Sequence, residues 1–415
     1  MLLATILAAS LGVTLLIDRP RHHLQTWTRT HLPSLARPLD AAIGRVVGWR
    51  GSGATADTIA RRAPRPYATE RLFQPVKPVF TPEPPQPSAR VLRVGPDQAL
   101  TSPAAAALIA RDGDVIEIEP GEYPGDTAVW SQSGLTLRGR GGMVWLDAQD
   151  TRLPQEKAIW LISGDAAVVE NIAFVHAHGR DRNGAGIRAE GTGLSVRNCY
   201  FFGNDTGMLV NPDPRSDVLI EHSEFAWNGH SSERAHGVYV HAVRRLIFRF
   251  NYLHHTVIGN YLKSRARETW VLYNRIGDES DGYGNYLIDL SNGGLAYVLG
   301  NLLWQGPLGE NATLVGYAAE GDHHPDGALY LVNNTLVNQR KVGRFARTWS
   351  RYPAHAWNNL LLGPGRLDVQ TFQAAANLRR PLADIGADLG ADLGADLGAD
   401  LGAGLTGSNP QGVSF

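Results

Sequence analysis

The stretch that decides the fold reads LIFRFN at residues 246–251, a short apolar run that ends in asparagine. The same phrase returns along much of the chain. Its copies are VVEN at 168–171, LSVRN at 194–198, VLYN at 271–274, VLGN at 298–301, LYLVNN at 329–334 and WNN at 357–359, with VLIEH at 218–222 carrying His222 in the same slot. The step between copies averages roughly 27 residues, which lies in the range of stacked structural repeats.

Most copies place apolar residues at every second position, a period that predicts β-strands. One such strand cannot bury its own apolar face, but a stack of successive coils can, so the repeat predicts a solenoid. The recurring asparagine suits an inward turn, where its amide bonds backbone groups and the amides of adjacent coils. We therefore expect these asparagines to be structural.

A second stretch, RDGDVIEIEPGEY at 111–123, follows an alanine-rich segment. It resembles the opening of the right-handed parallel β-helix (pectate-lyase-like) superfamily, and the likeness covers roughly residues 91–365. The resemblance implies an all-β fold, a right-handed parallel β-helix solenoid with an N-terminal capping helix. That helix is expected from Thr101 to Ala110, capped by Asp97 or Thr101. Because this fold carries lyases, hydrolases, epimerases and binding proteins, it implies no single chemistry.

The two ends of the chain differ from the repeat region in composition. Residues 1–17 are largely apolar and predict a signal peptide or membrane anchor, although arginines follow this segment rather than precede it. Residues 18–89 read as an Arg/Pro-rich linker, 90–375 as the β-helix domain, and 376–415 as a low-complexity tail that repeats GADL. We therefore expect a periplasmic, secreted or membrane-anchored protein that touches a membrane only through its N-terminal segment.

The charge balance bears on partners. The formal net charge is −1 and the sequence pI is about 6.9, so nothing indicates a nucleic-acid partner. We expect a monomer whose partner is an acidic polysaccharide, for the reasons that follow.

A further repeated phrase begins with glycine and runs into a strand: GIRAE at 186–190, GMLVN at 207–211, GVYVH at 237–241, GNYLK at 259–263 and GNYLI at 284–288. If Ile187, Met208 and Val238 point inward, the second and fourth positions after each glycine point outward. The second position then gives the column Arg188, Leu209, Tyr239, Tyr261, Tyr286. The fourth gives Glu190, Asn211, His241, Lys263 and Ile288, with Asp289 beside it.

One face of the solenoid is thus predicted to carry tyrosines beside charged groups. Aromatic rings suit sugar rings, and cations suit uronic acid carboxylates. The predicted substrate-binding residues are Tyr239, Tyr261, Tyr286, Glu190, Asn211, Arg188 and Asp289. The alternative is a solvated sheet face with incidental tyrosines, which pack well on pleated surfaces.

Residues 260–264 read NYLKS, and Asn274 follows on the next coil. This phrase is similar to one in alginate lyases and chondroitinase-B-type lyases, where a catalytic lysine precedes a serine. The resemblance implies that Lys263 is the base that removes the proton α to a uronate carboxyl group, with β-elimination of the 4-linked sugar.

Charge arguments extend this hypothesis. Arg265 and a protonated His241 would lower the pKa of Lys263, and Arg265 or Arg267 would neutralise the substrate carboxylate. The alternative is that His241 is the base and Tyr261 the acid.

The chain also departs from those lyases. They place acidic Ca²⁺ ligands close to the lysine, where this chain has TVIG at 256–259 without an acid. Their catalytic arginine lies on the next coil, where this chain has Asp289 between Ile288 and Leu290. We therefore expect no cofactor, with Ca²⁺ possible but its usual ligands not seen. The sequence EGDHHPD at 320–326 suggests a metal site at first sight, but we interpret it as a polar loop.

The leading hypothesis is a polysaccharide lyase that cleaves a uronate-containing polysaccharide by β-elimination. One alternative is a glycoside hydrolase of the same fold, which needs two carboxylates at a suitable separation; Glu190 and Asp289 are expected on coils too far apart. The other is a non-catalytic glycan-binding protein of the envelope or cell surface.

Overall fold

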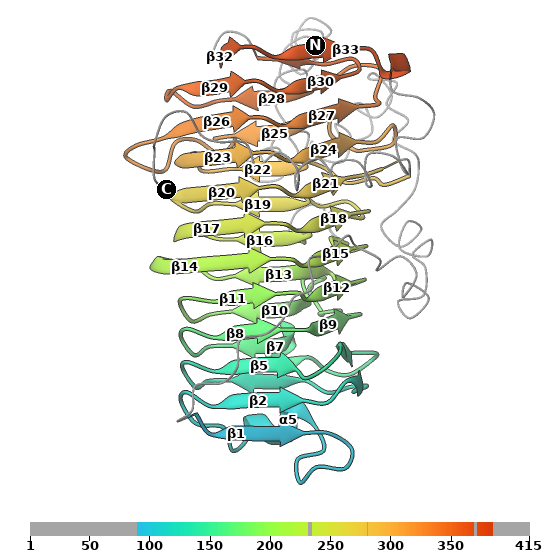
Figure 1. Cartoon of the computed structure of the whole chain (residues 1–415), viewed down its shortest axis with the longest axis vertical. Coiled ribbons are helices and arrows are strands. Elements are labelled where there is room, and N and C mark those ends of the chain that lie inside the picture. Colours follow the sequence, from blue (N-terminus) through green and yellow to red (C-terminus); the bar gives the residue numbers. More distant parts are fainter. Residues whose placement is uncertain (1–88, 231–234, 280, 369–371, 385–415) are drawn as a thin grey trace, which may run out of the picture. The chain divides into compact units, whose positions relative to one another are not determined.

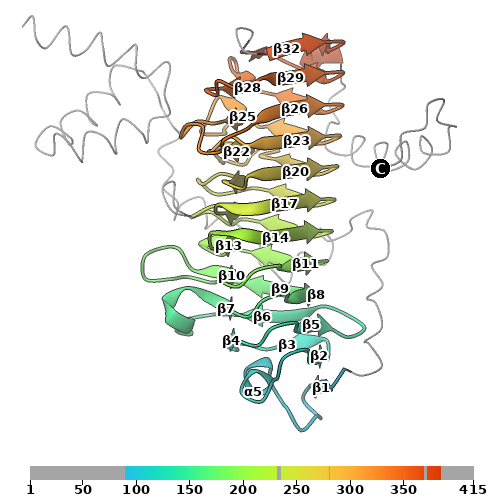
Figure 2. The ribbon, with the colours of Figure 1, turned by 90° about the vertical axis from the view of Figure 1, so that its left-hand side faces the viewer.

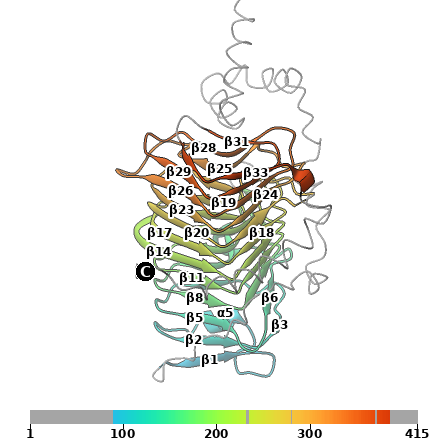
Figure 3. The ribbon, with the colours of Figure 1, turned by 45° about the horizontal axis from the view of Figure 1, so that its top comes forward.

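The computed structural model describes residues 89–230, 235–279, 281–368 and 372–384, which form a parallel β-solenoid of about 10 turns. Three parallel sheets form its walls, and a full coil contributes one strand to each (Figure 3). The predicted parallel β-helix fold is therefore confirmed. The expected segment 1–17, the expected linker 18–89 except residue 89, and the expected tail 376–415 from residue 385 onward lie outside the described residues.

The bounds of the strands, in their spatial order, are as follows. The twelve-stranded sheet contains β1 (Val91–Val94), β2 (Val115–Ile118), β5 (Thr136–Gly139), β8 (Val168–Glu170), β11 (Ser195–Arg197), β14 (Asp213–Glu221), β17 (Val243–Arg249), β20 (Glu268–Leu272), β23 (Leu295–Leu299), β26 (Ala328–Val332), β29 (Ala354–Trp357) and β32 (Phe372–Ala375). The ten-stranded sheet contains β4 (Ala128–Trp130), β7 (Ala158–Ile162), β10 (Ala185–Ala189), β13 (Thr206–Val210), β16 (Val238–Val240), β19 (Leu262–Ser264), β22 (Ile288–Leu290), β25 (Thr313–Tyr317), β28 (Arg344–Thr348) and β31 (Arg366–Leu367). The eleven-stranded sheet contains β3 (Gly121–Glu122), β6 (Val144–Asp147), β9 (Ile172–Val175), β12 (Tyr200–Phe202), β15 (Glu224–Ala226), β18 (Tyr252–His254), β21 (Arg275–Gly277), β24 (Leu302–Gln305), β27 (Thr335–Asn338), β30 (Leu360–Leu362) and β33 (Leu378–Arg380).

Strand β17 shows why the alternating phrase folds in this way. Leu246 and Phe248 are fully buried, while Ile247 and Arg249 on the opposite face are partly exposed. Each fully buried apolar side chain contributes about 1.5–3 kcal/mol relative to exposure. A strand gains this only when coils above and below close the interior, so the alternation and the stacking stabilise each other.

In the structure, the repeated asparagine position corresponds to two adjacent columns of residues. Residues of the first column have a left-handed backbone, with φ between 48° and 59° at Asn171, Asn198, His222, Phe250, Tyr273, Asn333 and Asn358. The second is buried and contains Asn251, Asn274, Asn301, Asn334 and Asn359.

The buried column is a ladder of amide hydrogen bonds. The backbone N–H and the side-chain amide of Asn274 both donate to Asn301 Oδ1, at 2.8 and 3.0 Å, and the same side-chain amide donates to the carbonyl of Phe248 at 3.0 Å. Asn301 repeats this pattern toward Asn334. The predicted structural role of the repeated asparagines is confirmed.

One α-helix, α5 (Pro103–Ala107), lies among the described residues, together with the 3₁₀ turns η2 (Pro154–Glu156) and η3 (Leu382–Asp384). Helix α5 lies with β1 at one end of the solenoid, and β32 is at the other (Figures 1 and 2). Its N-cap is Ser102, whose hydroxyl accepts from the N–H of Ala105, and not Asp97 or Thr101. A capping helix across 101–110 is therefore not confirmed, since the helix is only five residues long.

At the other end, β33 continues the eleven-stranded sheet to Arg380, past the boundary that the sequence suggests at residue 375. Within the residues that the structure describes, no helix has the length and hydrophobicity needed to cross a membrane.

Candidate functional site

The outer face of the ten-stranded sheet carries a line of polar residues. Strand pairing aligns Arg188 with Leu209 and Leu209 with Tyr239. It then aligns Tyr239 with Lys263 and Lys263 with Asp289. Parallel pairing places these five side chains on successive coils of one outward column.

A second outward column lies two residues further along each strand. The backbone N–H of Asn211 donates to the carbonyl of Ala189, and that of His241 to the carbonyl of Val210. Arg265 follows on the next coil, where its N–H donates to the carbonyl of Val240. The column therefore reads Glu190, Asn211, His241, Arg265. We call the two columns together the polar strip.

Two of the predicted substrate-binding tyrosines are not on this strip. Tyr261 is fully buried in the core, and its hydroxyl donates to Asp278 Oδ1 at 2.6 Å. Tyr286 is 3% exposed, with its ring near Gly316. The predicted tyrosine column is therefore wrong beyond Tyr239, and Tyr261 cannot be the acid in the alternative with His241 as base.

The error has a physical cause in the glycines. Gly259 and Gly284 were aligned with Gly237, but each fits a different close approach. A Cβ at Gly259 would lie 2.0 Å from the carbonyl oxygen of Ala235, and one at Gly284 would meet the ring of Tyr261. Close packing selects glycine at more than one column, so the glycine is not a fixed reference along the repeat.

The centre of the strip is a carboxylate held between two cations. Lys263 Nζ lies 2.7 Å from Glu320 Oε1, and Arg265 donates to Glu320 Oε2 at 2.5 Å. The Tyr239 ring lies nearby, 5.8 Å from Lys263 Nζ and 5.4 Å from the Arg265 guanidinium carbon. We call Lys263 and Arg265 the carboxylate clamp.

The clamp changes the expected state of Lys263. Burial alone would lower the pKa of this ammonium group, but the carboxylates of Asp289 and Glu320 outweigh burial, and the net pKa is raised. Asp289 Oδ2 lies 3.4 Å from Nζ, and Asp289 also accepts from the Asn260 side chain at 2.8 Å. Lys263 is therefore a cation in this arrangement, and the expected lowering of its pKa is wrong.

His241 is in the opposite state. Burial first, and then the positive charges of Arg265, Arg188 and Lys263, lower the pKa of His241 to about 4. Its ring is neutral at neutral pH, so it does not add the positive charge that was expected beside Lys263. Its Nδ1 lies 3.5 Å from the Tyr239 hydroxyl, and burial raises the pKa of that hydroxyl.

The other predicted site residues divide into two groups. Arg188 and Glu190 pair on the strip at 3.1 Å, and Asn211 lies 3.5 Å from Glu190. Arg267 lies beyond the end of β19, more than half exposed, and pairs with Asp326 at 3.1 Å. It therefore takes no part in the clamp.

Glu320 is the central residue of the strip, and it begins the stretch 320–326 that the sequence predicts to be a polar loop rather than part of the site. It belongs to the loop from Ala318 to Gly327, which follows β25, and it lies 57 residues from Lys263 in the chain. The corresponding turns after β16 and β19 are much shorter. An unusually long polar turn next to a candidate face is the signal that could have pointed to Glu320.

Glu320 also brings a carboxylate close to Asp289. Asp289 Oδ2 lies 3.4 Å and Glu320 Oε1 2.7 Å from Lys263 Nζ, so these two oxygens are at most about 6 Å apart. A separation of about 5–5.5 Å, as in retaining glycosidases, is compatible with this limit. One carboxyl of such a pair must be an acid with a raised pKa. Burial would raise the pKa of Glu320, but Lys263 and Arg265 outweigh it and lower the pKa.

One group of three side chains suited to a metal ion occurs among the described residues, namely His178, Asp205 and His230. It lies on the turns that lead into β10, β13 and β16, and it does not include Asp289 or Glu320.

Comparison with known structures gives several proteins of similar fold. Pectate lyase Pel9A is 14% identical, with 70% of this chain and 80% of that chain covered and a TM-score of 0.43. The pectin methylesterase from Aspergillus niger is 11% identical, with 73% and 89% covered and a TM-score of 0.33. The PL6 family alginate lyase AlyGC is 14% identical, with 69% and 53% covered and a TM-score of 0.21.

At these identities the likeness concerns the fold alone. No protein-family model matches the sequence, and no curated protein matches it. The chemistry of the strip therefore has to be argued from its own residues.

Proposed function

We propose that the polar strip binds an acidic polysaccharide and cleaves it by β-elimination, with the carboxylate clamp holding the uronate carboxyl group. The observation that carries the proposal is the position of the Glu320 carboxylate between Lys263 and Arg265, two cations that both lie over the Tyr239 ring. Two cations can bind the carboxylate of a uronate, and an aromatic ring beside them can pack against its sugar ring. A substrate carboxylate would take the place of Glu320.

The proposed step assigns a role to each group. Lys263 and Arg265 withdraw charge from the substrate carboxylate, which makes the proton on the neighbouring carbon more acidic. Neutral His241 takes that proton, a double bond forms between this carbon and the next, and the bond to the leaving sugar oxygen breaks. The Tyr239 hydroxyl gives a proton to that oxygen and regains one from His241.

This assignment replaces Lys263 as the base. A base has to be neutral at the working pH, and the raised pKa of Lys263 keeps it charged, whereas the lowered pKa of His241 keeps that ring neutral. Lys263 therefore fits the role of neutraliser, beside Arg265.

A glycoside hydrolase is the second candidate, favoured by the short separation of Asp289 and Glu320. Its products would differ, because hydrolysis gives new reducing ends without a carbon–carbon double bond.

The test follows the ultraviolet absorbance of unsaturated uronate ends, together with new reducing ends, on a panel of uronic acid polysaccharides. We expect absorbance with the wild type, a loss of about 10²–10⁴-fold with His241→Asn, and a large loss with Lys263→Met. The matched control is Arg244→Met. Arg244 forms an exposed ion pair with Asp217 on the twelve-stranded sheet, so this variant should keep full activity. New reducing ends without ultraviolet absorbance would show that the protein is a glycoside hydrolase and not a lyase. Polysaccharide binding without either product would show that it is a glycan-binding protein.

We also propose that the protein works outside the cytoplasm, because its proposed substrate is an extracellular polymer and residues 1–17 have the composition of an export segment. Mass spectrometry of the protein from periplasm, membrane and medium tests the location and any cleavage of that segment. Recovery of the intact chain from the cytoplasm alone would contradict the proposal.

A further inference from the structure

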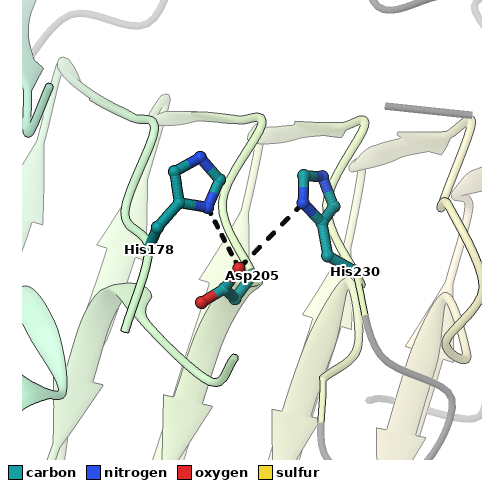
Figure 4. Close-up of side chains that lie close together, drawn as sticks. All are labelled: His178, Asp205 and His230. Carbon is teal, nitrogen blue, oxygen red and sulfur yellow. Dashed lines mark hydrogen bonds and ion pairs between the residues drawn. The ribbon is translucent and has the colours of Figure 1, made fainter. Parts of the chain in front are cut away.

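Three neighbouring turns outside the polar strip bring two imidazoles and a carboxylate together (Figure 4). His178 lies between β9 and β10, Asp205 between β12 and β13, and His230 between β15 and β16. Each of these turns links the eleven-stranded sheet to the ten-stranded sheet. The ligand atoms of the three side chains all lie within 4.8 Å of one another.

Asp205 is fixed at the centre of the group. It is 4% exposed, and its Oδ2 accepts from the backbone N–H groups of Gly179 and Gly184 at 2.7 and 3.0 Å. Its Oδ1 lies 3.0 Å from His178 Nδ1 and 4.0 Å from His230 Nδ1 (Figure 4). One carboxylate oxygen thus holds the turn between β9 and β10, and the other is directed to both imidazoles.

His230 is held in the orientation of a metal ligand. Its Nε2 lies 3.1 Å from the carbonyl oxygen of Trp227, which can only accept, so Nε2 carries a proton. In the neutral ring the lone pair is then on Nδ1, the atom on the side of Asp205 Oδ1. Metal-binding histidines commonly donate their other ring N–H to a carbonyl in this way, because the bond fixes the tautomer and the ring orientation.

We propose that His178, Asp205 and His230 bind Zn²⁺ through Nδ1, Oδ1 and Nδ1. Imidazole nitrogen with one carboxylate oxygen is a common zinc ligand set, whereas Ca²⁺ and Mg²⁺ prefer oxygen ligands. In a tetrahedral site with bonds of about 2.0–2.1 Å, ligand atoms lie roughly 3.3 Å apart. The oxygen–nitrogen distances of 3.0 and 4.0 Å lie on either side of that value, and all three ligand atoms lie within 4.8 Å of one another.

The ion would have two consequences. It joins three successive coils, so it clamps the turns along the edge of the ten-stranded sheet. Three protein ligands also leave a fourth position open to water or to an oxygen ligand. This inference stands apart from the proposed lyase function, because none of its residues belongs to the polar strip.

The alternative is a plain histidine–carboxylate hydrogen bond, and the chain offers a matched example. His176 Nδ1 lies 3.1 Å from Asp147 Oδ1, much as His178 lies from Asp205, but this pair belongs to no three-residue group in the described part of the chain. His176→Gln is therefore the control for His178→Gln and His230→Gln. Asp205 is left intact, because it holds backbone N–H groups.

The experiment is a calorimetric Zn²⁺ titration of the full-length chain after chelator treatment, with circular dichroism to verify each fold. The wild type and His176→Gln should bind one equivalent more than His178→Gln or His230→Gln, with Kd below about 1 µM. The visible spectrum of the Co²⁺-loaded wild type should show tetrahedral bands that both variants lack. Equal stoichiometry in wild type and both variants, or no sub-micromolar site in the wild type, would overturn the proposal.

Discussion

At the scale of single residues, Lys263 and His241 of the polar strip, which the sequence pattern places side by side, differ in their protonation state. Lys263 is buried and His241 is half-buried, and both lie near Arg265. Their pKa values nevertheless shift in opposite directions. Lys263 has two carboxylates within 3.4 Å, while the charged groups nearest His241 are mostly cations. The neighbours therefore decide that Lys263 is a cation and that the His241 ring is neutral.

The pH dependence of kcat/KM follows from that assignment. With His241 as the base, activity should fall only below about pH 4 and stay level through pH 7–9, since the raised pKa of Tyr239 keeps its hydroxyl protonated there. A pH–rate profile on an oligouronate measures this. A rate that keeps rising toward pH 10 and above would instead identify Lys263 as the base.

The lowered pKa of His241 should also make the free energy of unfolding depend on pH. The pKa of His241 is about 4 in the folded chain and about 6.5 when unfolded, so the unfolded chain binds the extra proton between these values. The wild type should therefore lose up to about 3 kcal/mol of unfolding free energy, relative to His241→Gln, as pH falls from 7 to 4. Urea unfolding of both proteins at several pH values measures the difference. Parallel pH curves would show that the His241 pKa is not depressed.

At the scale of elements, the amide ladder connects the coils. Asn301→Ala removes the acceptor of two bonds from Asn274 and the donors toward Asn334, and leaves buried polar groups unpaired. We expect a loss of about 2–3 kcal/mol in unfolding free energy. Asn358→Gly is the matched control, because Asn358 is exposed and left-handed with φ of 53°, which glycine tolerates. Equal losses in the two variants would show that the ladder contributes nothing special.

The elements also show what the sequence could predict. Alternation and the repeated asparagine identify strands such as β17 and the ladder, because burial and buried amides impose both patterns locally. The outward columns were correct at Arg188, Leu209 and Tyr239, then failed at Tyr261. Coil lengths vary, and a shift of two residues places Lys263 beside Tyr239, where Tyr261 was expected. Tyr261 precedes β19, and its ring is buried in the core.

At the scale of the whole molecule, the site depends on the loop after β25, two coils beyond β19. Glu320 reaches the clamp from 57 residues away, and no local pattern around Lys263 encodes that contact. In the proposed function, the carboxylate of Glu320 would compete with a substrate carboxylate for the same two cations. The solenoid would then supply the binding face, and the long turn would set how readily a ligand occupies it.

Glu320→Gln should therefore raise affinity. Removing the internal carboxylate increases the fraction of clamps open to a ligand, so the apparent Kd for an oligouronate should fall, by roughly 10-fold if the clamp is closed about nine-tenths of the time. Fluorescence titration measures the change, with the thermal midpoint as a check on folding. Weaker binding by a folded Glu320→Gln would show that Glu320 contacts the substrate rather than competing with it.

The most direct test of the central claim, that Lys263 and Arg265 hold a substrate carboxylate, is calorimetric binding of one oligouronate and of its methyl ester. We expect the acid to bind the wild type about 10–100-fold more tightly than the ester. Lys263→Met should largely abolish this preference, while Arg244→Met should keep it. Equal affinity for acid and ester in the wild type, or an unchanged preference in Lys263→Met, would show that Lys263 and Arg265 do not hold the substrate carboxylate.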